Sequence, residues 1–161
     1  VLVNLGHEHS IQESFIDLPY AKKVSLEAHE IALSICSKPN FKPLHLKHIA
    51  TSASTLRVIA NREGDHVKAL DWSRIAVATQ LRFIEYFPDP QSKSVLVRYY
   101  MCECEELLRA GNLSDARKTL DLATTQYNEM EHSLPDAPDY QDLREGLTQI
   151  AQEVKDAETA K

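Results

Sequence analysis

The sequence predicts an all-α protein, an antiparallel helix-turn-helix repeat array of about seven helices. Prolines separate long Pro-free stretches. Because proline is tolerated in the first turn of a helix and breaks its interior, they mark helix boundaries. Apolar residues recur within these stretches at helical spacing, and no segment shows sustained period-two alternation. Two turns, centred on Gly64 and Gly111, resemble each other in sequence and predict tight reversals between antiparallel helices.

The N-terminal half contains three predicted helices before the first Gly-centred turn. Ser10 followed by Glu13 forms a capping box, which predicts a short helix near residue 11. The prolines that follow predict helices over residues 19–37 and 43–62. Their predicted apolar faces carry Val24, Ala28, Ile31, Ala32 and Ile35 in the first, and Leu46, Ile49, Ala53, Leu56 and Ala60 in the second.

The remaining helices follow from local start and stop signals. Gly64 ends one helix and Asp65 caps a fourth, which reaches about residue 87. Asp89 followed by Pro90 opens a fifth helix to residue 110, and the turn at Gly111 leads into a sixth, to about residue 132. A seventh, over residues 138–157, has one apolar stripe: Tyr140, Leu143, Leu147, Ile150, Ala151 and Val154.

This pattern divides the chain into three parts. Residues 1–18 form an N-terminal segment with a short helix, residues 19–132 form helix pairs, and residues 133–161 form a C-terminal capping helix. A terminal repeat has no further neighbour, so its last helix is expected to dock one face inward and to present a polar face to water.

Composition excludes several classes of function. The 161 residues, 43% of them hydrophobic, suit one globular unit, and the net charge of −6 disfavours nucleic-acid binding. No apolar run approaches the roughly 20 residues that span a bilayer, so we expect no membrane segment. Three cysteines predict a reducing, cytoplasmic compartment rather than a disulfide framework. The first residue is Val1 and no signal peptide follows it, which indicates a fragment or a processed product.

Alanines recur at fixed distances after both Gly-centred turns. Ala69 and Ala76 follow Gly64 by five and twelve residues, and Ala116 and Ala123 follow Gly111 in the same way. With Leu56, Tyr100, Leu107 and Leu120 at large positions, the sequence resembles the tetratricopeptide-repeat family, in the long-helix form of kinesin-light-chain-type repeats. An earlier copy of the second helix is placed at Ala28. Arg57 and Cys104 depart from the family pattern, which prefers small residues there, and Ser73 replaces a large apolar residue.

The resemblance implies a concave groove, lined by the first helix of each pair, that takes an extended peptide or a helix. Its residues would be Thr51, Ser54, Val58, Asn61 and Arg62 in one repeat and Arg98, Met101, Glu105 and Arg109 in the next. Val58 and Glu105 stand where the carboxylate-clamp subtype has Asn, which argues against a chaperone-peptide clamp. Arg62 and Arg109 recur at equivalent places and can bind an acidic partner or balance the neighbouring Glu63 and Glu105.

Residue types that carry catalysis or metal binding do not form a motif. His45 and His48 can share a helix face, but a metal site needs three or four converging ligands. Cys102 and Cys104 lie about 200° apart around a helix and are interpreted as small hydrophobic residues. Trp72 is interpreted as a packing residue where helix pairs meet. We therefore expect no catalytic residue, no metal and no cofactor.

The sequence thus favours a non-enzymatic scaffold or adaptor module that binds a protein or peptide partner, one option being an acidic partner. Neither nucleic acid nor membrane is expected to bind, and homo-oligomerisation is possible. Two alternatives stay open: a regulatory sensor domain that binds a signalling peptide or small ligand, and a helical-bundle enzyme or metal carrier. A bound ion or cofactor would distinguish the last of these.

Overall fold

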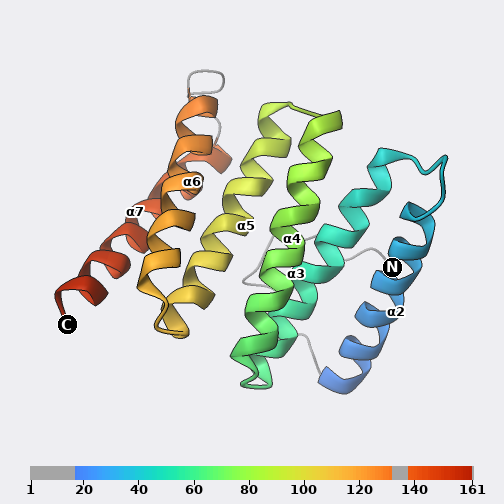
Figure 1. Cartoon of the computed structure of the whole chain (residues 1–161), viewed down its shortest axis with the longest axis horizontal. Helices are drawn as coiled ribbons and strands as arrows, with labels where there is room; N and C mark the ends of the chain where they lie inside the picture. The colour runs from blue at the N-terminus through green and yellow to red at the C-terminus, as the bar shows by residue number, and fades with distance from the viewer. Residues whose placement is uncertain (1–16, 132–137, 161) are drawn as a thin grey trace.

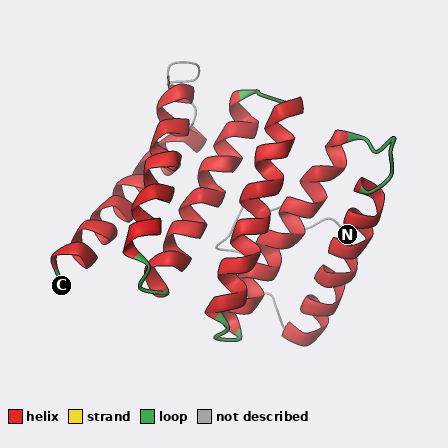
Figure 2. Cartoon of the chain, in the orientation of Figure 1, coloured by secondary structure: helices red, strands yellow, loops and turns green. Residues whose placement is uncertain are grey.

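The computed structural model describes residues 17–131 and 138–160, and all regular structure in this part of the chain is helical (Figures 1 and 2). The all-α prediction is confirmed. Six α-helices are described instead of about seven, because the short helix expected near residue 11 lies outside the described residues. The helices are α2 (Leu18–Cys36), α3 (Leu46–Arg62), α4 (His66–Tyr86), α5 (Pro90–Arg109), α6 (Leu113–Glu131) and α7 (Pro138–Thr159), with a 3-10 turn, η1 (Pro43–His45), before α3.

Helix starts are fixed by local capping. Asp89 accepts a hydrogen bond from the backbone N–H of Ser92 at 2.8 Å and precedes Pro90, as the sequence predicts. Asp17 caps α2 in the same way, through the N–H of Tyr20 at 3.0 Å. The helix predicted from residue 43 begins as the 3-10 turn η1 and becomes α-helical only at Leu46.

The two Gly-centred turns have the same backbone geometry. Gly64 and Gly111 adopt left-handed conformations, with φ of 76° and 71°. In each turn the residue after the glycine donates its N–H to a carbonyl five residues back, Asp65 to Ala60 and Asn112 to Leu107, both at 2.9 Å. This is the Schellman arrangement of a helix end. The predicted equivalence of the two turns therefore extends to their hydrogen bonds.

Successive helices lie side by side, from α2 at one end of the molecule to α7 at the other (Figure 1). Each of α2 to α6 packs against the next helix in the chain, and α7 packs against both α6 and α5. The turns between α3 and α4, and between α5 and α6, are only a few residues long, so these packed neighbours run antiparallel.

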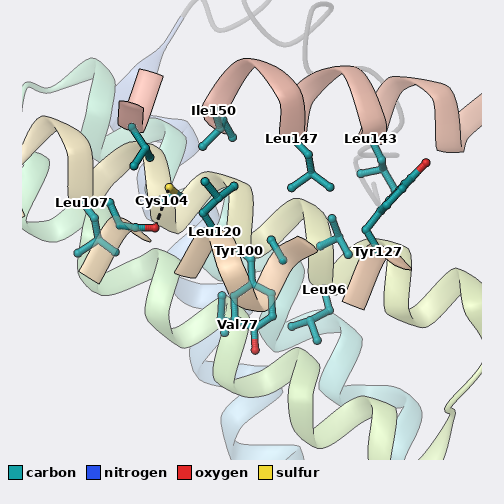
Figure 3. Close-up of a cluster of buried hydrophobic side chains, with 14 of the residues drawn as sticks. Val77, Leu96, Tyr100, Cys104, Leu107, Leu120, Tyr127, Leu143, Leu147 and Ile150 are labelled. Atoms are coloured by element: carbon teal, nitrogen blue, oxygen red, sulfur yellow. Dashed lines mark hydrogen bonds between the residues drawn. The ribbon is translucent and has the colours of Figure 1, made fainter. Parts of the chain in front are cut away.

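The larger hydrophobic core joins α5, α6 and α7 (Figure 3). Leu96, Tyr100 and Leu107 of α5 meet Leu120 and Tyr127 of α6 beneath α7. The stripe predicted for α7 is buried there except for Ala151, which is exposed: Tyr140, Leu143, Leu147, Ile150 and Val154. A smaller core at the opposite end contains Ala32, Leu46, Ile49 and Phe83.

Candidate functional site

A groove of about 360 Å³ lies between α2 and α3. Its α2 wall is mostly apolar, with Val24, Ala28, Ile31 and Ile35 beside Ser25. Its other wall carries His45 of η1 and His48, Thr51, Ser52 and Thr55 of α3. Two large apolar side chains of this wall are open to solvent, since Val24 is 44% exposed and Ile31 is 61% exposed. Tyr20, one turn before Val24, is 65% exposed. Contiguous apolar surface of this kind is typical of interaction sites.

The groove exists because α2 docks through a different face from the predicted one. The buried residues of α2 are Ala21, His29 and Ala32. Of the apolar face predicted from the sequence, only Ala32 is buried. Ala28 is exposed, so it does not occupy the packed position that Ala69 and Ala116 hold at 0% exposure. The predicted apolar face therefore becomes the wall of a groove.

His29 fixes the rotation of α2 about its axis. Ser52 of α3 donates its hydroxyl hydrogen to the carbonyl of Ile49 at 3.0 Å, so its oxygen is left to accept from His29 Nδ1 at 2.8 Å. The same imidazole packs against Trp72 of α4 in a T-shaped arrangement, with ring centroids 5.1 Å apart. Burial lowers the pKa of His29 below its usual value, which favours the neutral ring. Trp72 of α4 thus packs against α2, in agreement with its interpretation as a packing residue, and His29 contacts both α3 and α4.

A buried carboxylate connects α3 to α5. Glu106 of α5 is 0% exposed, and one of its oxygens, Oε1, accepts hydrogen bonds from Arg57 Nη1 at 3.1 Å and from Asn61 Nδ2. Its other oxygen, Oε2, lies 2.8 Å from Arg109 Nη1, in an ion pair whose angles do not make a hydrogen bond. Each oxygen of the buried carboxylate therefore faces a guanidinium, one from α3 and one from its own helix. We call Glu106, Arg57, Asn61 and Arg109 the Glu106 cluster.

Glu106 is not among the site residues predicted from the sequence, although the sequence contains a signal for it. Arg57 stands where the tetratricopeptide-repeat pattern prefers a small residue, and it lies between the buried Leu56 and Ile59. A buried arginine requires a carboxylate partner, so Arg57 points to an acidic residue on a packed neighbouring helix.

The predicted groove residues of α3 do not share one environment. Thr51 lines the α2–α3 groove, whereas Ser54 is buried at 7% exposure. Val58 is half-buried and Arg62 is exposed. Asn61 belongs to the Glu106 cluster, so its amide is engaged within the protein. On α3, the structure therefore brings only Thr51 into the groove described here.

The predicted groove residues of α5 lie elsewhere. Arg98 is exposed, and Met101 lies against α7, where a Cβ atom placed on Gly146 would come within 2.3 Å of the Met101 methyl carbon. Arg109 lies 3.8 Å from Glu105 and 2.8 Å from Glu106, so the alternative in which it balances neighbouring carboxylates is the one observed. Partner binding by these α5 residues stays a prediction.

In the part of the chain that the structure describes, the histidine and cysteine side chains form no converging set of metal ligands. His45 and His48 share a face as predicted, with ring centroids 5.9 Å apart. Within residues 17–131 and 138–160, no group of three or more His, Cys, Asp or Glu side chains is placed to hold a metal ion. Cys104 is buried and donates to the carbonyl of Ala116 at 3.3 Å, and burial raises the pKa of its thiol to about 12 (Figure 3).

Comparison of the chain with protein-family models, with curated proteins and with solved structures found no match in any of the three. Of the helices described here, none has the length and apolar character that crossing a membrane requires.

Proposed function

We propose that this chain is a non-enzymatic protein-interaction module that takes an amphipathic helix of a protein partner in the groove between α2 and α3. The observation that carries the proposal is the apolar wall of α2, where Val24 and Ile31 are solvent-exposed beside a groove. A helix that lays its apolar face into such a groove is a recurring mode of peptide recognition, with anchors spaced three and four residues apart.

The α3 side of the groove presents polar side chains that carry no fixed charge. Its lining residues there are His45, His48, Thr51, Ser52 and Thr55, whereas the charged residues of α3, Lys47, Arg57 and Arg62, do not line the groove. A partner helix would therefore meet the apolar wall of α2 on one side and hydroxyl and imidazole groups on the other. Those groups can hydrogen-bond to the polar edge of an amphipathic helix.

The equivalence of the two Gly-centred turns supports a repeat array as the architecture behind this groove. Both turns have the same hydrogen bonds, and the small residues that follow them, Ala69, Ala76, Ala116 and Ala123, are all buried at 1% exposure or less. We propose that the helix pairs α3–α4 and α5–α6 are two copies of one tetratricopeptide-like unit.

Selection from a displayed library of helical peptides tests the function. The full chain would be used for selection, and binding of the selected peptides would be compared with two variants, Ile31→Glu in the groove wall and Leu122→Glu on α6. Leu122 is a matched control, because it is 51% exposed and lies outside the groove lining.

We expect selected peptides with apolar residues at helical spacing along one face. They should bind the parent chain and Leu122→Glu equally, and Ile31→Glu at least about 10-fold more weakly, because a charge replaces apolar contact. Peptides that bind Ile31→Glu as tightly as the parent chain would refute the groove as the binding site.

A further inference from the structure

We infer that the helix occupying this groove is α2 of a second copy of the same chain, the two α2 helices lying antiparallel about a two-fold axis. The inference rests on the proposed function, because it names the occupant of the same groove. The interface would contain the apolar stripe of α2, which we define as Tyr20, Val24, Ala28, Ile31 and Ile35.

The two ends of the helical array differ in the surface they offer. At the α7 end, none of the large apolar side chains of that helix is among those exposed, and its outer face carries Gln141, Arg144, Glu145, Thr148 and Gln149. At the α2 end, Tyr20, Val24 and Ile31 are exposed. Stacking copies head to tail would place the polar α7 face on the apolar stripe, whereas two-fold pairing places apolar surface on apolar surface.

The apolar stripe is nearly symmetric along the helix. Its residues lie eight and four positions before Ala28 and three and seven positions after it. In an antiparallel pair centred near Ala28, Val24 therefore faces Ile31 of the second copy, and Tyr20 faces Ile35. The small side chain of Ala28 at the centre permits a close approach of the two helix axes.

The charges beside the stripe favour the antiparallel direction. Lys23, Glu27 and Glu30 follow one edge of the stripe and are all exposed. A two-fold axis places the same edges of both helices together, so Lys23 of each copy lies near Glu30 of the other. Glu27 lies near the two-fold axis and faces Glu27 of the second copy, so the two carboxylates repel each other. Lys23 of the same helix lies 4.0 Å from Glu27 and offsets only part of this repulsion.

Sedimentation equilibrium of the full chain, from micromolar to millimolar concentration, tests this arrangement. We expect a monomer–dimer equilibrium that Ile31→Glu weakens about 100-fold or more, since each dimer contains two substituted sites. Leu122→Glu is the control and should leave the dimer unchanged. Circular dichroism of each variant would show that the exposed substitutions leave the fold intact.

Charge variants distinguish an antiparallel α2 pair from any other use of the stripe. Glu30→Lys should weaken the dimer about 3-fold to 10-fold, and the swap Lys23→Glu with Glu30→Lys should restore it. Glu27→Gln should tighten the dimer, because it removes the repulsion at the axis. The antiparallel pairing is overturned if the swapped variant dimerises as weakly as Glu30→Lys and if Glu27→Gln does not strengthen the dimer.

A chain that stays monomeric at every concentration would overturn the inference. If the full chain is monomeric but a variant without residues 1–16 dimerises, residues 1–16 are the occupant of the stripe in the full chain. A monomeric chain that still binds the selected peptides would refute the second copy as occupant and leave the proposed function standing. Failure of both dimerisation and peptide binding would refute both.

Discussion

Replacing Glu106 by Gln tests how much the buried carboxylate contributes to joining α3 and α5. The substitution preserves the shape of the side chain and removes its charge. It leaves the guanidinium of Arg57, whose side chain is only 8% exposed, beside a neutral amide. Breaking a buried ion pair by removing one partner costs about 3–5 kcal/mol. Because Gln can still accept a hydrogen bond and the Arg109 side chain is 44% exposed, we expect a loss of about 2–4 kcal/mol.

Urea unfolding followed by far-UV circular dichroism would measure this loss, and the thermal midpoint should fall by roughly 5–15 °C. Arg109→Ala is the matched comparison and should cost under about 1 kcal/mol, since its half-exposed charge is screened by water. Replacing both Arg57 and Glu106 by Met should recover most of the stability, because no unpaired charge is then buried. The reasoning is refuted if Glu106→Gln costs under about 0.5 kcal/mol, or if the double Met variant is as unstable as Glu106→Gln.

Three further predictions concern backbone, pH and thiol chemistry. Gly64→Val and Gly111→Val should each cost about 1–2 kcal/mol of unfolding free energy from left-handed backbone strain, since an added Cβ meets nothing within 4 Å at either site; unchanged melting temperatures would contradict this. Burial lowers the pKa of His29 below 6.5, so the unfolded chain binds the proton more readily and stability should fall as pH drops below 6.5. His29→Gln should flatten this pH dependence of stability. If the curves of stability against pH are parallel for the parent chain and for His29→Gln, the dependence does not come from His29. With a pKa of about 12, Cys104 should react with iodoacetamide far more slowly than Cys102 in the native chain, and equal rates would contradict the burial of the Cys104 thiol.

Helix boundaries could be predicted because their signals are local in the sequence. Asp89 and Pro90 together specify the start of α5, and the caps found in the structure lie within three residues of the groups they satisfy. Gly64 and Gly111 likewise specify reversals through their own conformations. Such signals need no knowledge of tertiary contacts, which is why all six described α-helices begin within about three residues of their predicted positions.

The candidate site could be predicted only in part, because its decisive contacts join residues far apart in the chain. Glu106 and Arg57 are separated by 49 positions, and His29 and Ser52 by 23. The periodicity of α2 identified its apolar stripe but not the face that docks on α3. That choice depends on a hydrogen bond and a ring contact supplied by two other helices. Thr51 is the predicted groove residue that the structure places in the groove.

The close approach of α7 to α5 provides a spectroscopic reporter. The chain contains only two methionines, and the methyl group of Met101 fills the space that a side chain at position 146 would need. Met130, the other, is buried at 1% exposure in the core shared with α7. Methyl labelling of methionine would thus give a two-line NMR spectrum. Replacing Gly146 by Ala should shift the Met101 line, because the added methyl group meets the Met101 side chain. The position of that line therefore reports how α7 packs against α5, and no probe has to be attached.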